Sequence, residues 1–87
     1  MEIRIDPHTR ARMSIRGIAE DEIRATLQSG FSVAAHNGRW AREKLVDFNR
    51  TWAGRFYPQK RVRVAYVEED GRLFTVTAIA YYGRWED

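Results

Sequence analysis

Arginine, tyrosine and histidine are the residues of this chain whose types suit phosphate chemistry. Arg61 and Arg63 alternate along one segment, and Tyr81 lies in a second segment rich in β-branched and aromatic residues. Near the start of the chain, His8 and Arg12 have the spacing of neighbours on a helix. Arginines can neutralise charge that develops on a phosphate, and a tyrosine or histidine can move the proton of a 2′-hydroxyl. These five residues are the predicted catalytic set of a metal-independent phosphodiester cleavage, although a surface that only binds phosphates would use the same residue types.

Basic residues are concentrated in the middle of the chain. Residues 39–63 carry eight Lys or Arg and two Asp or Glu, a net charge of +6, whereas the remaining residues have a net charge of −3. Five aromatic residues lie among these cations, a mixture that suits phosphate contacts combined with base stacking. Solvated strands whose aromatic side chains face the core would give the same pattern. The predicted nucleic-acid-binding residues are Arg39, Arg42, Lys44, Arg55 and Lys60.

Other chemistries lack the residues they need. The chain has no cysteine, which excludes a disulfide scaffold, a thiolate metal site and a cysteine nucleophile. His8 and His36 are its only histidines, they are far apart, and neither belongs to a paired-ligand motif. The sequence also lacks a glycine-rich nucleotide loop and a serine nucleophile elbow. We therefore expect neither a metal nor a cofactor.

Length and hydropathy predict a small cytoplasmic protein. Eighty-seven residues suffice for one core, so residues 1–87 are predicted to form a single domain. No apolar run approaches the roughly 20 residues of a membrane span, and the charged start is unlike a signal peptide. We expect no interaction with a membrane.

Two short helices are predicted first. Asp6 can cap a helix that has Pro7 at its first position, and Gly17 can end it, which gives a helix over 7–16. Acidic residues follow at the start of a second helix over about 19–29, which Gly30 ends. Neither helix can bury its narrow apolar stripe alone, so the two must pack on another element.

Strands follow the helices. Residues 31–36 are predicted as a strand and 43–49 as a weaker one, although a helix over 39–50 fits the apolar spacing as well. Residues 60–67 and 73–82 are predicted as the two strands of a hairpin. The predicted fold class is α+β, with two N-terminal helices on one face of an antiparallel sheet of three or four strands.

The register of that hairpin decides which side chains face outward. A two-residue turn at Asp70-Gly71 would mix polar and apolar residues on both faces, so we predict a three-residue loop over 69–71. Arg61 would then lie opposite Ile79, and Arg63 opposite Thr77. The predicted apolar face comprises Val62, Val64, Tyr66, Phe74, Val76, Ala78 and Ala80. The predicted open face comprises Arg61, Arg63, Thr75, Thr77, Ile79 and Tyr81.

The helical region resembles a known family. The run His8-x-x-x-Arg12-Met13-x-x-Arg16-Gly17-Ile18, followed by Glu22-Ile23-x-x-x-Leu27, is similar to small bacterial proteins of unknown function grouped with the RelE/ParE-like toxin superfamily, near the BrnT toxins. Lys60-x-Val62-x-Val64, Thr75-Val76-Thr77 and Tyr82-Gly83 fit the same pattern, so the similarity spans His8 to Gly83. Ala19 departs from the pattern, because relatives often place a capping Ser or Thr there.

The resemblance implies two helices followed by a curved antiparallel sheet. For some members it also implies cleavage of free or ribosome-bound mRNA and neutralisation by an antitoxin. Other members of the superfamily poison DNA gyrase, and the catalytic residues vary, so no proven catalytic residue transfers to this chain.

Two functions are therefore predicted side by side. The first is a toxin-like, metal-independent endoribonuclease acting on mRNA, and the alternative is a non-catalytic module that binds nucleic acid or protein. An acidic antitoxin segment is the expected partner, with carboxylates on Arg61 and Arg63 and apolar anchors at Trp52, Tyr57 or Trp85. Burial of those three aromatic residues in the monomer is the competing explanation.

Overall fold

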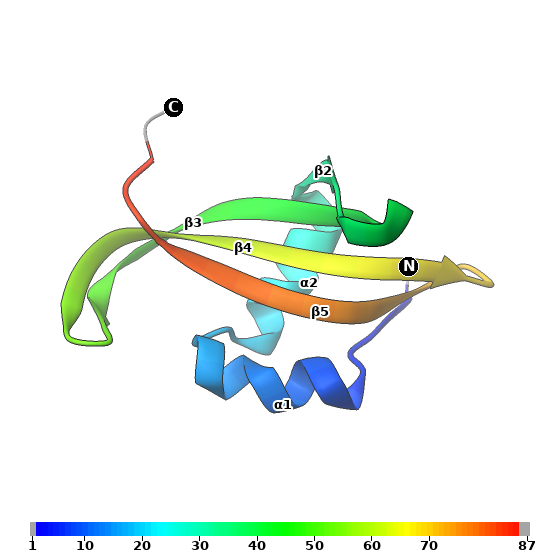
Figure 1. Cartoon of the computed structure of the whole chain (residues 1–87), viewed down its shortest axis with the longest axis horizontal. Coiled ribbons are helices and arrows are strands. Elements are labelled where there is room, and N and C mark those ends of the chain that lie inside the picture. Colours follow the sequence, from blue (N-terminus) through cyan, green and yellow to red (C-terminus); the bar gives the residue numbers. More distant parts are fainter. Residues whose placement is uncertain (1, 86–87) are drawn as a thin grey trace.

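A five-stranded sheet covered on one side by two helices makes up the fold (Figure 1). The computed structural model describes residues 2–85. Its elements are β1 (Glu2–Arg4), α1 (Pro7–Arg16), α2 (Glu20–Ser29), β2 (Phe31–Ala34), the 3₁₀ turn η1 (His36–Gly38), β3 (Trp40–Trp52), β4 (Arg55–Glu69) and β5 (Arg72–Gly83).

Both helices begin and end close to where the sequence predicts. The carboxylate of Asp6 caps α1 by accepting a hydrogen bond from the amide of Thr9, and Gly17 ends the helix in the left-handed conformation. At the start of α2, Ala19 offers no side-chain cap, but its amide donates to Glu22 at 2.9 Å. The side chain of Glu22 thus satisfies one free backbone donor at this helix end.

The sheet has more strands than predicted, and β3, β4 and β5 are longer than predicted. The helical alternative for residues 39–50 is wrong, because β3 pairs with β4 from Trp40 to Trp52 as one long antiparallel ribbon. Strand β2 is shorter than predicted, since η1 begins at His36. The sheet order is β1-β5-β4-β3-β2.

Strand β1 was not predicted, and it makes the sheet mixed rather than antiparallel. It pairs parallel to the start of β5, where Ile3 lies opposite Leu73. Three residues are too few for a hydrophobic period to stand out, so only the pairing with β5 reveals this strand. The predicted count of three or four strands is therefore wrong, because it omits β1.

The β4–β5 hairpin turns through two residues rather than the predicted three. Asp70 and Gly71 both have positive φ, 52° and 75°, as tight hairpin turns require. The register then shifts between Ala65 and Tyr66, where β5 contains one extra residue. Beyond this bulge, inward residues of β4 pair with inward residues of β5. A two-residue turn alone would have paired inward apolar residues with outward polar ones.

Away from the turn, the predicted inward residues are confirmed. Between the bulge and the turn, the prediction holds for Tyr66 of β4, which packs against the core, but it is wrong for β5. Thr75, expected on the open face, is buried and donates a hydrogen bond to Asp6 at the start of α1. Val76, expected inward, lines a pocket on the outer face. The confirmed inward residues are Val62, Val64, Tyr66, Ala78 and Ala80.

The core lies between the helices and the inner face of the sheet. Helix α1 packs on β5, and α2 packs on β3 and β4 (Figure 1). Buried apolar side chains from both layers form one cluster of Ile3, Ile18, Ile23, Leu27, Val62, Val64, Leu73 and Ala78. Neither α1 nor α2 covers the outer face of β3, β4 and β5. Within residues 2–85, no helix is long and apolar enough to cross a membrane.

Gly17 is the position where an added methyl group should be most damaging. Its φ is +70°, and a Cβ atom there would lie 2.4 Å from the Tyr82 hydroxyl and 2.8 Å from the Trp52 ring. Gly54 has a similar φ of +80° but open space around it. We expect Gly17→Ala to lower the free energy of unfolding by about 1–3 kcal/mol more than Gly54→Ala, because only Gly17→Ala adds a clash. Urea denaturation of both variants measures the difference; equal losses would contradict the packing described here.

Asp6 makes the stability dependent on pH. Burial raises the pKa of its carboxyl, but hydrogen bonds from Thr9, Thr75 and nearby backbone amides outweigh it, so the pKa lies below its usual 3.8. This contribution to stability is complete above the ordinary pKa and is lost as the pH falls through the folded pKa. We expect the stability of Asp6→Asn to fall less steeply than the wild type below about pH 4. Asp70→Asn, in the exposed turn, should keep the wild-type slope in thermal melts from pH 2 to 6.

Candidate nucleic-acid interface

The outer face of the sheet brings together three of the predicted catalytic residues. We call the outward side chains of β3, β4 and β5 the open face; its central members are Glu43, Arg61, Arg63, Ile79 and Tyr81. Arg61 lies opposite Tyr81 and Arg63 opposite Ile79, in each case two residues further along β5 than predicted. Tyr82 points inward, which confirms that only Tyr81 is on this face.

Glu43 holds the two arginines in place. Its side chain is 3% exposed, and one carboxylate oxygen accepts from Nε and Nη2 of Arg63 at 3.1 and 2.9 Å. The other oxygen lies 3.8 Å from Nε of Arg61, an ion pair without a hydrogen bond. The arginine side chains themselves are 34% and 35% exposed. One buried carboxylate therefore holds Arg63 by two hydrogen bonds and Arg61 by charge alone, and it leaves the pair with a net positive charge.

Aromatic rings add a second constraint on Arg61. Its guanidinium carbon is 5.3 Å from the ring centre of Tyr81 and 5.0 Å from that of Trp85. Arg63 lies 5.9 Å from the same tyrosine ring. Cation–π contacts of this kind restrict the side chain without using its hydrogen-bond donors. Donors on the exposed edge of the guanidinium groups are thus free to meet an anion.

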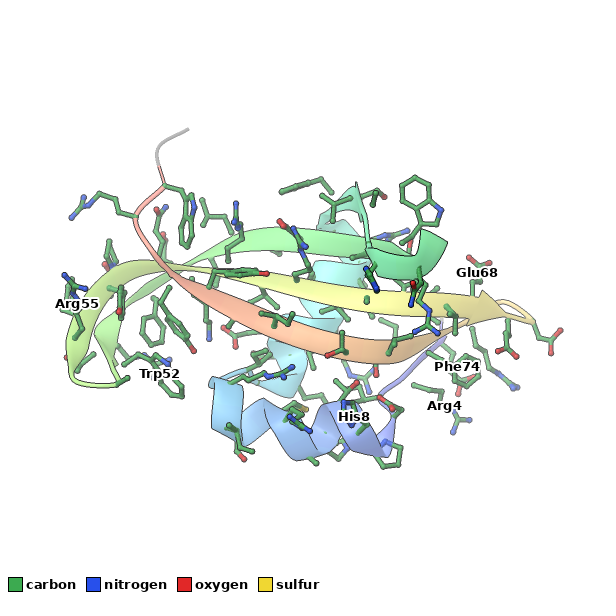
Figure 2. All side chains as sticks on the ribbon, viewed as in Figure 1. Arg4, His8, Trp52, Arg55, Glu68 and Phe74 are labelled. Atoms are coloured by element: carbon green, nitrogen blue, oxygen red, sulfur yellow. The ribbon has the colours of Figure 1, made fainter. Side chains whose placement is uncertain are left out.

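His8 and Arg12 do not join this group. Both are exposed on α1, which packs beside β5 on the helix-covered side, as Figure 2 shows for His8. Proton transfer at the open face therefore cannot involve His8 in this fold. Among the five predicted catalytic residues, Tyr81 is the one proton-transfer group that lies with the arginines.

Three of the predicted nucleic-acid-binding residues point to the helix-covered side of the sheet and contact the helical region. Lys60 is 1% exposed, and its ammonium group donates to the Gly17 carbonyl at 2.9 Å and lies 2.8 Å from the carboxylate of Glu22. Arg42 donates to the Leu27 carbonyl, and Lys44 donates to the Ser29 hydroxyl at 2.9 Å. Cations at the end of α2 complement the negative end of the helix dipole.

The remaining two cations are exposed. Arg39 follows η1 and lines a pocket on the open face together with Arg63. Arg55 lies at the tip of the β3–β4 hairpin, far along the long axis of the molecule (Figure 2). Arg39 thus extends the open face, whereas Arg55 lies apart from it.

The three predicted aromatic anchors also lie on different sides of the sheet. Trp52 stacks on Tyr82 at 5.1 Å, and the Tyr57 ring is 5.7 Å from that tyrosine, so both are half-buried against the inner side. Burial also raises the pKa of Tyr82, with a smaller contribution from the negative charge of Glu22. Trp85 alone of the three expected anchors contacts the open face.

Glu43 and His36 were missed at the sequence level. Glu43 is one of two acids in a strongly basic stretch, and its role appears only when β3 is paired with β4, which places it opposite Arg63. His36, considered only as a metal ligand, lines the pocket beside Arg63. Among residues 2–85, no three His, Asp or Glu side chains gather closely enough to hold a metal ion.

Comparisons of the chain with protein-family models, with curated proteins and with solved structures return no match.

Proposed function

We propose that this chain is a toxin-like protein whose open face holds the phosphates of mRNA and cleaves the strand without a metal ion. The observation that carries the proposal is the pair of guanidinium groups fixed by buried Glu43 on an uncovered sheet face. Two prepositioned arginines with a net positive charge suit a phosphodiester, because neither group has to be reorganised when the anion arrives. The resemblance to RelE/ParE-like toxins supports the same function, since residues 7–83 have the implied order of two helices before the main strands.

The chemistry would use the 2′-hydroxyl of the RNA itself. Its oxygen attacks the adjacent phosphorus, the bond from phosphorus to the 5′-oxygen breaks, and the products are a 2′,3′-cyclic phosphate and a free 5′-hydroxyl. The 2′-hydroxyl proton passes to solvent, and the Tyr81 hydroxyl gives a proton to the leaving oxygen. Arg61 and Arg63 stabilise the extra negative charge on the phosphate. General acid catalysis of this kind contributes about 10²–10⁴-fold in rate.

An acidic antitoxin segment is the proposed partner of the same face. Its carboxylates would pair with Arg61 and Arg63, and an apolar side chain would pack on Trp85 at the rim. Trp52 and Tyr57 are not part of this proposed interface, because both pack against Tyr82 on the helix-covered side of the sheet.

A non-catalytic RNA-binding module is the second candidate. The position of His8 and Arg12 on α1 favours it, because the open face then has Tyr81 as its one predicted proton-transfer group. Binding needs only the arginines, whereas cleavage needs proton transfer as well.

RNA cleavage in EDTA separates the two functions. Purified protein is incubated with single-stranded RNA, and growth is followed in parallel after induction in a bacterial host. The endoribonuclease proposal expects growth arrest and fragments with cyclic phosphate ends, both lost in Arg61→Ala/Arg63→Ala and kept in Arg12→Ala. Salt-sensitive binding without fragments would select the binding module. Neither binding nor cleavage would refute both.

A further inference from the structure

A pocket on the open face lies directly beside the arginine pair. It has a volume of about 210 Å³ and lies where η1 approaches β4 and β5. Ala65, Val76 and Ile79 provide apolar wall, His36 and Asn37 contribute polar groups from η1, and Arg63 forms the side nearest Glu43. Arg63 therefore belongs both to the pocket and to the pair that would hold a phosphate.

The size and lining of the pocket restrict what it can hold. Sites that enclose drug-sized ligands have volumes of about 300–1,000 Å³, so this smaller pocket suits a single ring system. Its apolar wall suits a flat face, and imidazole and amide groups can hydrogen-bond to a polar edge. Single-stranded RNA offers such a group next to every phosphate, and proteins commonly hold its bases on aromatic or guanidinium planes.

We propose that the pocket holds one nucleobase of the RNA strand whose phosphate lies on Arg61 and Arg63. The proposal rests on the proposed function, since it takes the arginine pair as the phosphate site. The base packs between the apolar wall and the guanidinium of Arg63, and its edge faces His36 and Asn37. The adjoining phosphate then meets the exposed edges of the guanidinium groups that Glu43 fixes.

A base-binding pocket would also make the protein favour single-stranded RNA over paired RNA. A paired base cannot leave its stack without an unpairing cost, whereas an unpaired base can enter directly. The strand is thus fixed at two points, the ring and its neighbouring phosphate. Two-point attachment sets which phosphodiester bond lies beside Tyr81.

The test compares adenosine 5′-monophosphate with ribose 5-phosphate, which has the phosphate but lacks the base. Binding is followed by two-dimensional NMR of the whole protein in EDTA. We expect the nucleotide to bind at least tenfold more tightly and to shift the signals of Ala35, Ala65 and Ile79, which all line the pocket. Equal affinities with no shift at these residues would overturn the base pocket while leaving the phosphate site in place.

Pocket-filling variants keep the two proposals separable. Val76→Phe, or Ala35→Phe at a second lining residue, should remove the preference for the nucleotide and leave the affinity for ribose 5-phosphate unchanged. Arg63→Ala should weaken both ligands. If neither phosphate ligand binds the wild type, the proposed phosphate site fails, and adenosine alone then decides the pocket: shifts at Ile79 support it, and none overturns it.

Discussion

Arg61→Ala combined with Arg63→Ala should lower the affinity for single-stranded RNA by about 10²–10⁴-fold. A hydrogen bond to a charged group contributes about 1.5–3 kcal/mol, and each 1.4 kcal/mol is a factor of ten in affinity. The double variant loses two such groups at the point where the structure fixes them on Glu43. Fluorescence anisotropy with labelled RNA in EDTA measures the change. The slope of log affinity against log salt should also become shallower by about 1.4.

Controls for this variant address both folding and general charge. The alanine changes leave the buried carboxylate of Glu43 unpaired, so Arg61→Gln/Arg63→Gln, which keeps hydrogen-bond donors near it, is measured alongside. Arg12→Ala and Arg55→Ala remove the same charge from exposed sites outside the open face and should change affinity less than threefold. A loss in these controls as large as in the double variant would show that overall charge, and no particular face, holds the RNA.

Glu22→Ala should be the most destabilising change of a charged residue at the start of α2. It removes the carboxylate that pairs with Lys60, whose side chain is 2% exposed, and so leaves an uncompensated buried ammonium. Breaking a buried pair in this way costs about 3–5 kcal/mol. Glu22→Ala also removes the acceptor for the Ala19 amide. Because small domains have only about 5–15 kcal/mol of stability, urea denaturation should show a large shift of the midpoint.

A double-variant cycle identifies the cause of that loss. Lys60→Met in the Glu22→Ala background removes the orphaned charge and should recover most of the stability. Glu20→Ala is the matched control, because Glu20 is in the same helical turn but forms exposed ion pairs with Arg10 and Arg24, which contribute little to stability. A double variant less stable than Glu22→Ala would contradict the buried pair. Lys60→Met should bind RNA as the wild type does.

The helices could be predicted because their signals are local. Asp6-Pro7, Gly17 and Gly30 act within one turn of the chain, and the structure places α1 and α2 at the predicted positions. Strand β1 is defined by a partner distant in sequence, and the full length of β3 by its pairing with β4 across the turn at 53–54. Local spacing therefore left residues 39–50 open between strand and helix.

In the β4–β5 hairpin, the predicted loop is one residue too long and the bulge is not predicted, and these two errors partly cancel. The sorting of inward and outward residues correctly indicated that the strand pairing is offset from that of a plain two-residue turn. The offset comes from a bulge near Ala65 and not from a longer loop. A bulge leaves no composition signal of its own. Thr75 was consequently placed on the wrong face, and the predicted partners of Arg61 and Arg63 were each two residues away from the true ones.

The candidate site was predictable only in part, because residue type does not reveal burial. Arg61, Arg63 and Tyr81 come together as expected, since alternation along paired strands places them on one face. Lys60 belongs to the same basic run but points inward to Glu22, and Glu43 carries the wrong charge for a phosphate site yet fixes both arginines. Lys60 is buried in its pair with Glu22, whereas Arg61 and Arg63 remain partly exposed beside Glu43.

The central claim, that RNA is held on the open face, is tested most directly by titrating the isotope-labelled wild-type protein with a short single-stranded RNA in EDTA and recording backbone amide NMR signals. The account predicts salt-sensitive shifts that concentrate on the middle of β4 and β5 around Arg61, Arg63, Ile79 and Tyr81, with α1 unaffected. Shifts concentrated on α1 around His8 and Arg12, or no shifts at a protein concentration of about 10⁻⁴ M, the weak end of non-specific binding, would contradict it.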